Sequence, residues 1–183
     1  MIAVVDYGTG NISAITNIYK FLNVNVSIVS DADQLKKAKK IILAGVGAFD
    51  DSMLRLNASG MREILDQQVL KNNVPVLGIC VGMQMMACSS EEGKENGLCW
   101  FNNSKVIKFD ETKLPHKPKL PHMGWNNIKP FKHHPIFNEI NKNVEFYFLH
   151  SYWFSCEQEH KLAVTNYGIE FPSVISKGNI FGL

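Results

Sequence analysis

The segment around Cys80 has the residue types and the spacing for covalent chemistry. Residues 74–84 read Val-Pro-Val-Leu-Gly-Ile-Cys-Val-Gly-Met-Gln, an apolar run that passes through a glycine-flanked thiol into a sequence favouring helix. A strand, a tight turn and a helix form a nucleophile elbow, in which the side chain at the turn projects toward a substrate. Because Cys80 lies at the N-terminus of the predicted helix, we expect a lowered pKa for its thiol. The alternative is a buried cysteine in an ordinary strand-to-helix turn.

Two other segments follow predicted strands and can assist such a thiol. Asp6-Tyr7-Gly8 ends the apolar run 2–6, and Gly45-Val46-Gly47 follows the apolar run 40–44. Because the carboxyl ends of parallel strands meet at one edge of a sheet, we expect both beside Cys80. The glycines of 45–47 can turn backbone N–H groups toward a substrate oxygen. Considered alone, segment 45–47 fits an ordinary loop better. The site is indicated because three such segments are all predicted at the same edge of the sheet.

The elements that must position these residues alternate between strand and helix. Apolar residues recur at three and four positions from Ile12 to Leu22, which predicts a helix with one buried face. Ser30 or Asp31 can cap a short helix after the second strand. We expect strands at 2–6, 24–29, 40–44 and 74–79 and helices at 12–22, 50–56, 61–70 and after Cys80. This order predicts an α/β fold: an open, mainly parallel twisted sheet, flavodoxin-like, with helices on both faces.

The second half of the chain has a different pattern. Residues 113–121 contain three prolines and predict an exposed loop, and residues 122–126 predict a polar and aromatic turn. We expect short strands, paired as a meander at the end, over residues 104–109, 144–149, 162–165, 173–176 and 179–183. Too little chain follows the loop for a second core, so we predict one domain over residues 1–183.

Composition excludes several classes of function. The chain has 183 residues, 45% hydrophobic and 20% charged, which is typical of a globular domain. A net charge of +2 without long runs of like charge argues against nucleic acid or an anionic membrane as partner. No apolar stretch is long enough to span a bilayer, and the first residues read as a strand, not as a signal peptide. We therefore expect a cytoplasmic protein.

Cysteines and histidines give no sign of a metal or cofactor. Cys80, Cys88, Cys99 and Cys156 form no Cys-x-x-Cys pair, and we expect all of them to be reduced. We expect His133 and His134 in a solvated polar loop and His116 and His160 in charged loops. The methionines at 83, 85 and 86 are expected in the core. Gly8-x-Gly10 lacks the third glycine of a dinucleotide loop, since Ser13 stands there.

Taken together, these motifs resemble a known family. Residues 78–84 resemble the nucleophile motif of the class I (triad) glutamine amidotransferases. The resemblance runs over the whole chain and narrows to glutaminase subunits of imidazole glycerol phosphate synthase, which acts in histidine biosynthesis. The segments that narrow it are 6–11, 45–49, 121–126 and 147–152.

The resemblance implies a role for each matched residue. Cys80 would attack the side-chain amide of glutamine, and the N–H of Val81 and the oxyanion strand at Val46, after a peptide flip, would stabilise the oxyanion. The glutamine pocket would be lined by Gly47, Gln84, Ser151 and Tyr152. The residues facing the partner, a (β/α)8-barrel cyclase in a heterodimer, would be Asn11, Trp125, Asn126 and Tyr147. Ammonia would pass through the barrel to make imidazole glycerol phosphate and an aminoimidazole carboxamide ribotide, with no cofactor and no metal.

The sequence departs from the family at two points. Ala44 stands where the family has proline, which loosens the predicted oxyanion strand. The family continues beyond Asn-Ile-Phe-Gly to His-Pro-Glu, whereas the sequence given ends at Leu183. The resemblance thus places the triad histidine and glutamate beyond Leu183 and implies a C-terminally truncated fold.

Three hypotheses follow from this. The first is the glutaminase subunit itself. The second is a catalytically impaired subunit that docks on the cyclase, and the third is a paralogue that supplies ammonia for amidino-sugar synthesis.

Overall fold

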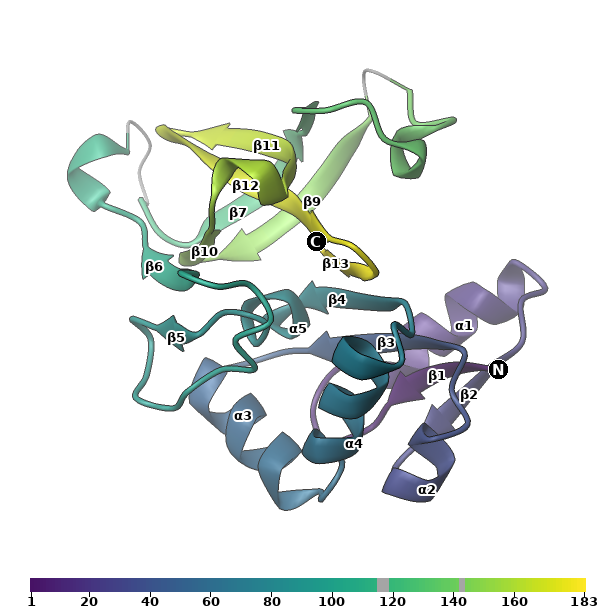
Figure 1. Cartoon of the computed structure of the whole chain (residues 1–183). Helices are drawn as coiled ribbons and strands as arrows, with labels where there is room; N and C mark the ends of the chain where they lie inside the picture. Colours follow the sequence, from purple (N-terminus) through teal and green to yellow (C-terminus); the bar gives the residue numbers. More distant parts are fainter. Residues whose placement is uncertain (115–118, 142–143) are drawn as a thin grey trace.

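An eight-stranded sheet organises the computed structural model, which describes residues 1–114, 119–141 and 144–183 (Figure 1). Along the sheet the strands are β2 (Val26–Val29), β1 (Ile2–Val5), β3 (Lys40–Gly45), β4 (Val76–Cys80), β13 (Ile180–Gly182), β12 (Ile169–Lys177), β11 (Lys161–Tyr167) and β8 (Lys129–Pro130). The pairs from β2 to β13 are parallel, and those from β13 to β8 are antiparallel. The predicted mainly parallel sheet is confirmed.

Helices cover both faces of the parallel part of the sheet. Successive residues of a strand point to opposite faces, so strands that are apolar throughout need cover on both sides. The helices are α1 (Ile12–Phe21), α2 (Ala32–Leu35), α3 (Phe49–Ala58), α4 (Arg62–Asp66), which continues as the π-helix η1 (Gln67–Lys71), and α5 (Val81–Gln84). Val4 and Ile42 pack against α1. Ala3 and Leu43 face the opposite side, in a larger cluster with residues of α2, α3 and α4. Asp31 caps α2, as one of the two predicted alternatives.

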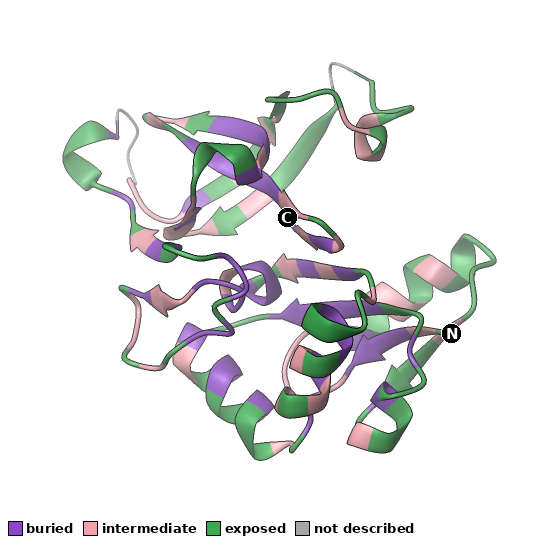
Figure 2. Ribbon diagram, viewed as in Figure 1, coloured by how far each residue is buried: buried purple, intermediate pink, exposed green. Residues whose placement is uncertain are grey.

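The predicted buried face of α1 is only partly correct. Ile12 is buried, but Ile18 and Leu22 expose 59% and 58% of their surface. The reason is the position of α1 beside β2, which is the last strand of the sheet. Among the described residues no strand lies beyond this edge to cover the outer side of the helix, and Figure 2 shows much of α1 as exposed.

Two smaller sheets complete the second half of the chain. β6 (Lys105–Lys108) pairs with β5 (Ser89–Ser90) and β10 (Tyr152–Ser155), and β7 (His122–Asn127) pairs antiparallel with β9 (Glu145–His150). The predicted turn at 122–126 is therefore wrong. Its glycine and polar residues have low strand propensity, and pairing with β9 overrides that propensity. The predicted meander is confirmed as β11, β12 and β13.

The described loops of this half contain the short 3-10 helices η2 (Glu111–Lys113), η3 (Pro135–Phe137) and η4 (Gln158–His160). The predicted exposed loop at 113–121 falls partly outside the described residues, because 115–118, with His116, are among those left out. Leu114, inside the predicted loop, is buried beside Phe109 and Phe171. His160, in the predicted charged loop, is buried too, with its ring edge-on to Phe101. The described part of the chain contains no helix long and apolar enough to cross a lipid bilayer.

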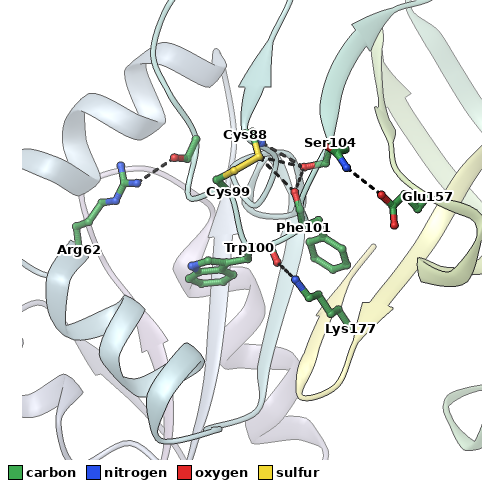
Figure 3. Close-up of a disulfide and its surroundings, with 10 residues drawn as sticks. Arg62, Cys88, Cys99, Trp100, Phe101, Ser104, Glu157 and Lys177 are labelled. Carbon is green, nitrogen blue, oxygen red and sulfur yellow. Dashed lines mark hydrogen bonds between the residues drawn. A yellow bond between two sulfur atoms is a disulfide. The ribbon is translucent and has the colours of Figure 1, made fainter.

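Cys88 and Cys99 form a disulfide, which overturns the expectation of reduced thiols for this pair (Figure 3). The chain reverses between them, and the Cys99 N–H donates to the Ala87 carbonyl at 3.1 Å. The reversal is held from outside by Arg62 of α4, which donates to the Gly97 carbonyl at 2.9 Å. The two cysteines are 11 positions apart, and only the tertiary contacts bring them together. Cys80 and Cys156 are free.

The disulfide predicts how many thiols react. Protein purified without reductant, then denatured and treated with iodoacetamide, should carry two modifications, and four after reduction. Reduction should also lower the free energy of unfolding by about 3 kcal/mol, because it releases a constraint on the unfolded chain. Intact mass and urea denaturation measure these effects, and a Cys88→Ser/Cys99→Ser variant should show two modifications in both cases. Four modifications before reduction would contradict the pairing.

Candidate active site

Cys80 occupies a strained turn between β4 and α5. Its φ of 56° and ψ of −117° lie outside the regions that side chains usually adopt. The flanking glycines make the turn possible, because a Cβ on Gly82 would lie 1.8 Å from the Leu43 carbonyl oxygen. A Cβ on Gly78 would similarly lie 2.8 Å from the Gly82 carbonyl oxygen. The predicted strand–turn–helix geometry around Cys80 is therefore confirmed, and such strain is concentrated at functional sites.

The strand ends named by the sequence do meet at one edge of the sheet. Gly45, the last residue of β3, is paired in register with Cys80 of β4. Tyr7 follows β1, and its hydroxyl donates to the Ala44 carbonyl at 2.8 Å. Burial raises the pKa of Tyr7, so this hydroxyl stays a neutral donor. The prediction that three segments meet at one edge of the sheet is confirmed.

Segment 45–47 leaves the sheet beside the thiol. Val46 is exposed, and its carbonyl accepts a hydrogen bond from the Thr9 hydroxyl at 2.8 Å. Gly47 has a φ of 92°, a conformation that glycine adopts without strain, and no atom lies within 4 Å of the position of a Cβ. Sequence reasoning missed Thr9, which engages the predicted oxyanion strand from the neighbouring strand end.

A cavity of about 320 Å³ opens beside the elbow. Cys80 and Gln84 line it from β4 and α5, and its remaining walls come mainly from β9, β10 and β12 and are largely apolar. The Gln84 side-chain amide donates to the Tyr152 carbonyl at 3.3 Å, which joins two of the predicted substrate residues. Gly47 and Ser151, also predicted for substrate binding, do not line this cavity.

The predicted lowering of the Cys80 pKa is wrong. Burial of the thiol at the elbow raises its pKa, and the Val81 N–H opposes this effect only in part. The residue as a whole is exposed, so a small reagent can reach it. The helix that follows has four residues, too few for a substantial dipole. Within the described residues no hydrogen bond joins the sulfur to a histidine ring.

The predicted partner residues lie on three different surfaces. Trp125 and Tyr147 face each other across β7 and β9, expose 68% and 54% of their surface, and have ring centroids 5.6 Å apart. Met123 and Leu149 extend this face, which is apolar and exposed. Asn126 points to the other side of β7 and is half-buried. Asn11 caps α1 through its side chain, which accepts from the Ala14 N–H at 3.1 Å.

Metal-binding groups are scarce in the described part of the chain. Glu157, Glu159 and His160 offer ligand atoms within 4.8 Å of one another. They lie at η4, on a different element from the elbow, and two of the three are exposed carboxylates. We assign them no role in the site.

The sequence pattern of the family "Glutamine amidotransferase class-I" matches residues 3–183. The chain belongs to this family. It is 49% identical to imidazole glycerol phosphate synthase subunit HisH of Bdellovibrio bacteriovorus, over all of this chain and 90% of that protein. It is 40% identical to subunit HisH of Leptospira borgpetersenii and 42% to subunit HisH 2 of Methanococcus maripaludis, over all of this chain and 89% of each. The resemblance drawn from the motifs is confirmed.

Solved structures of amidotransferases share the fold. One described as a glutamine amidotransferase has a TM-score of 0.75 at 14% identity, over all of this chain and 88% of the other. Another glutamine amidotransferase, from Thermotoga maritima, has a TM-score of 0.67 at 14% identity, over all of this chain and 73% of the other. At these identities the likeness extends to the fold alone.

The raised pKa of Cys80 predicts its reactivity as a function of pH. Only the thiolate is alkylated, so the rate rises with pH and reaches half its plateau at the pKa of the folded protein. We expect that midpoint above about 8.5, the ordinary value for cysteine. Stopped-flow alkylation with iodoacetamide gives the profile. Burial raises the pKa of Cys156 to about 11, and a Cys80→Ser variant measures its contribution. A midpoint near pH 7 would contradict the direction of the shift.

Proposed function

We propose that this chain is the glutaminase subunit of an imidazole glycerol phosphate synthase. The observation that carries the proposal is a free cysteine in a strained elbow, at a cavity that it shares with Gln84 and Tyr152. The family and the 49% identity to a HisH subunit support glutamine as the substrate. They also favour histidine biosynthesis over the two alternatives, a supplier of ammonia for amidino sugars and an impaired docking subunit.

The proposed reaction passes through a thioester. The sulfur of Cys80, after losing its proton to a base, attacks the side-chain amide carbon of glutamine and forms a carbon–sulfur bond. The negative charge moves to the amide oxygen, where the Val81 N–H and a second N–H from 45–47 would donate hydrogen bonds. Collapse of this intermediate expels the nitrogen, which takes up a proton and leaves as ammonia. Water then cleaves the thioester to release glutamate and restore the thiol.

The raised pKa of Cys80 makes the base necessary. A thiol that is mostly protonated at neutral pH gains its nucleophilic form only when a neighbouring group removes the proton. Each oxyanion donor should then contribute about 2.7–4 kcal/mol of transition-state stabilisation. We propose that activity is low until substrate and partner order segment 45–47, where the Thr9 hydroxyl now engages the Val46 carbonyl.

We propose the cyclase, a (β/α)8 barrel, as the partner in the complex. The face formed by Met123, Trp125, Tyr147 and Leu149 supports an association of this kind, because exposed apolar patches mark interaction sites. Tryptophan and tyrosine are enriched among the residues that dominate binding energy. Tyr147 also lines the cavity that contains Cys80, so a partner on this face would be close to the site of ammonia release. A biosynthetic complex of this kind implies a cytoplasmic location.

Replacement of Cys80 tests the catalytic role. With glutamine as the only nitrogen source, a Cys80→Ala variant should reduce cyclase product to the background level, because no thioester can form. With added ammonium salt, the same complex should make product at the wild-type rate. The control is Cys156→Ala, which removes a free thiol outside the cavity and should keep glutamine-dependent activity. Equal glutamine-dependent rates for Cys80→Ala and the unmodified chain would refute the proposal and favour a docking subunit.

Replacement of Trp125 tests the partner face. Trp125→Ala should weaken binding to the cyclase by about 2 kcal/mol, roughly 30-fold in Kd, as measured by isothermal titration calorimetry. Phe21, which is 85% exposed on α1, provides a matched aromatic control, and Phe21→Ala should leave Kd unchanged. The assignment fails if Phe21→Ala weakens binding and Trp125→Ala does not.

A further inference from the structure

Two histidines form a pair between the β7–β9 hairpin and the central sheet. His122 and His150 are partners in the register of β7 and β9, and Nδ1 of His122 lies 2.9 Å from Nε2 of His150. Both rings are packed among aromatic side chains, including Phe148, Phe171 and Tyr167. Burial lowers the pKa of His150, so its ring is neutral at pH 7. The sequence had suggested no role for either histidine.

The hydrogen-bond partners determine which nitrogen of each ring carries the proton. Nδ1 of His150 lies 2.8 Å from the Tyr152 carbonyl oxygen, which can only accept, so this nitrogen is the donor. Nε2 of the neutral His150 ring must then accept, and it faces Nδ1 of His122. His122 is therefore also protonated on Nδ1. We assign both rings to this tautomer from the network of partners.

Asn126 is the first donor in this series of hydrogen bonds, at its outer end. Its Oδ1 accepts from the Asn127 N–H at 2.8 Å, and its Nδ2 donates to the Asn166 carbonyl at 3.0 Å, which together define the orientation of the amide. The same Nδ2 lies 3.2 Å from Nε2 of His122, the nitrogen that accepts in this tautomer. The bonds thus run in one direction, from Asn126 through His122 and His150 to the Tyr152 carbonyl.

At its inner end this series of hydrogen bonds reaches the cavity beside Cys80. The Tyr152 carbonyl accepts two hydrogen bonds, from Nδ1 of His150 and from the side-chain amide of Gln84. Gln84, Tyr152 and His150 itself line the cavity. We propose that His150 and His122 are positioning residues. They hold the Tyr152 carbonyl in the place where it orients Gln84 for the substrate. They also connect that carbonyl to the β7 and β9 strands, which carry Trp125. The kinetic consequence rests on the proposed glutaminase function, whereas the tautomers do not.

Asparagine and glutamine distinguish positioning from simple filling of space. The side-chain nitrogen of asparagine can occupy the place of Nδ1 of histidine, and that of glutamine the place of Nε2. At both positions Nδ1 is the donor, so asparagine can preserve the bond toward Tyr152 and glutamine cannot. If the rings only filled volume, glutamine would be the better substitute, because it is closer to histidine in size. The two roles therefore predict opposite orders of activity.

The kinetic test compares His150→Asn with His150→Gln, and His122→Asn with His122→Gln, in complex with the cyclase. We expect the KM for glutamine to be about fivefold higher in each glutamine variant than in the matching asparagine variant, the effect of one hydrogen bond. The value of kcat should change less, because among the described residues neither ring is hydrogen-bonded to the Cys80 sulfur. A KM in either glutamine variant equal to or below that of its asparagine partner would overturn the positioning role.

A second measurement does not depend on activity. Long-range ¹H–¹⁵N correlation spectra of the full chain labelled at histidine report the protonated nitrogen of each ring. We expect both His122 and His150 to carry hydrogen on Nδ1 at pH 7–8, and the signal that is missing from the spectrum of each asparagine variant identifies the ring. Hydrogen on Nε2 of His122 or His150 would overturn the inference even if glutaminase activity is present. Loss of glutaminase activity in the wild-type complex, with the expected tautomers, would refute the proposed function alone.

Discussion

The backbone contact between α5 and β3 is the constraint on which the site depends. The first turn of α5 lies so close to β3 that a methyl group at Gly82 would overlap the Leu43 carbonyl. A helix that begins this close to the neighbouring strand forces Cys80 into a conformation with positive φ, which costs on the order of 1–3 kcal/mol. Burial of Val81, Met83, Met85 and Met86 offsets this cost. The core thus holds the thiol at the edge of the sheet.

The same packing explains the chemistry of the thiol. An elbow packed this closely against the sheet surrounds the thiol with protein atoms on its inner side, and this partial burial raises the pKa of Cys80. The helix behind it is too short to reverse the effect through its dipole. A cysteine of this kind is protonated at rest and becomes a nucleophile only when a base and a substrate are in place. That property suits an enzyme whose ammonia should be released only in the presence of an acceptor.

The β7–β9 hairpin connects the outer surface with the cavity, because alternate residues of a strand point to opposite faces. One face presents Trp125 and Tyr147 to solvent, and the other contributes His122 and His150 to the interior. Hydrogen bonds lead from His122 through His150 to the Tyr152 carbonyl, which also accepts from Gln84. The reversal at Cys88–Cys99 anchors the other end of α5, where the Leu98 N–H donates to the Met85 carbonyl at 2.7 Å. The segment that follows the thiol is therefore tied to the structure at both ends.

Local sequence by itself determined the elbow, the alternation of the first half and the convergence of strand ends at Cys80. These features follow from glycine spacing and apolar periodicity, which act over a few residues. Tertiary structure decided the rest: the strand at His122–Asn127, which needs β9 as a partner, and the disulfide between cysteines 11 positions apart. It also decided the raised pKa of Cys80 and the histidine pair, because burial and hydrogen-bond direction depend on atoms brought from distant parts of the chain.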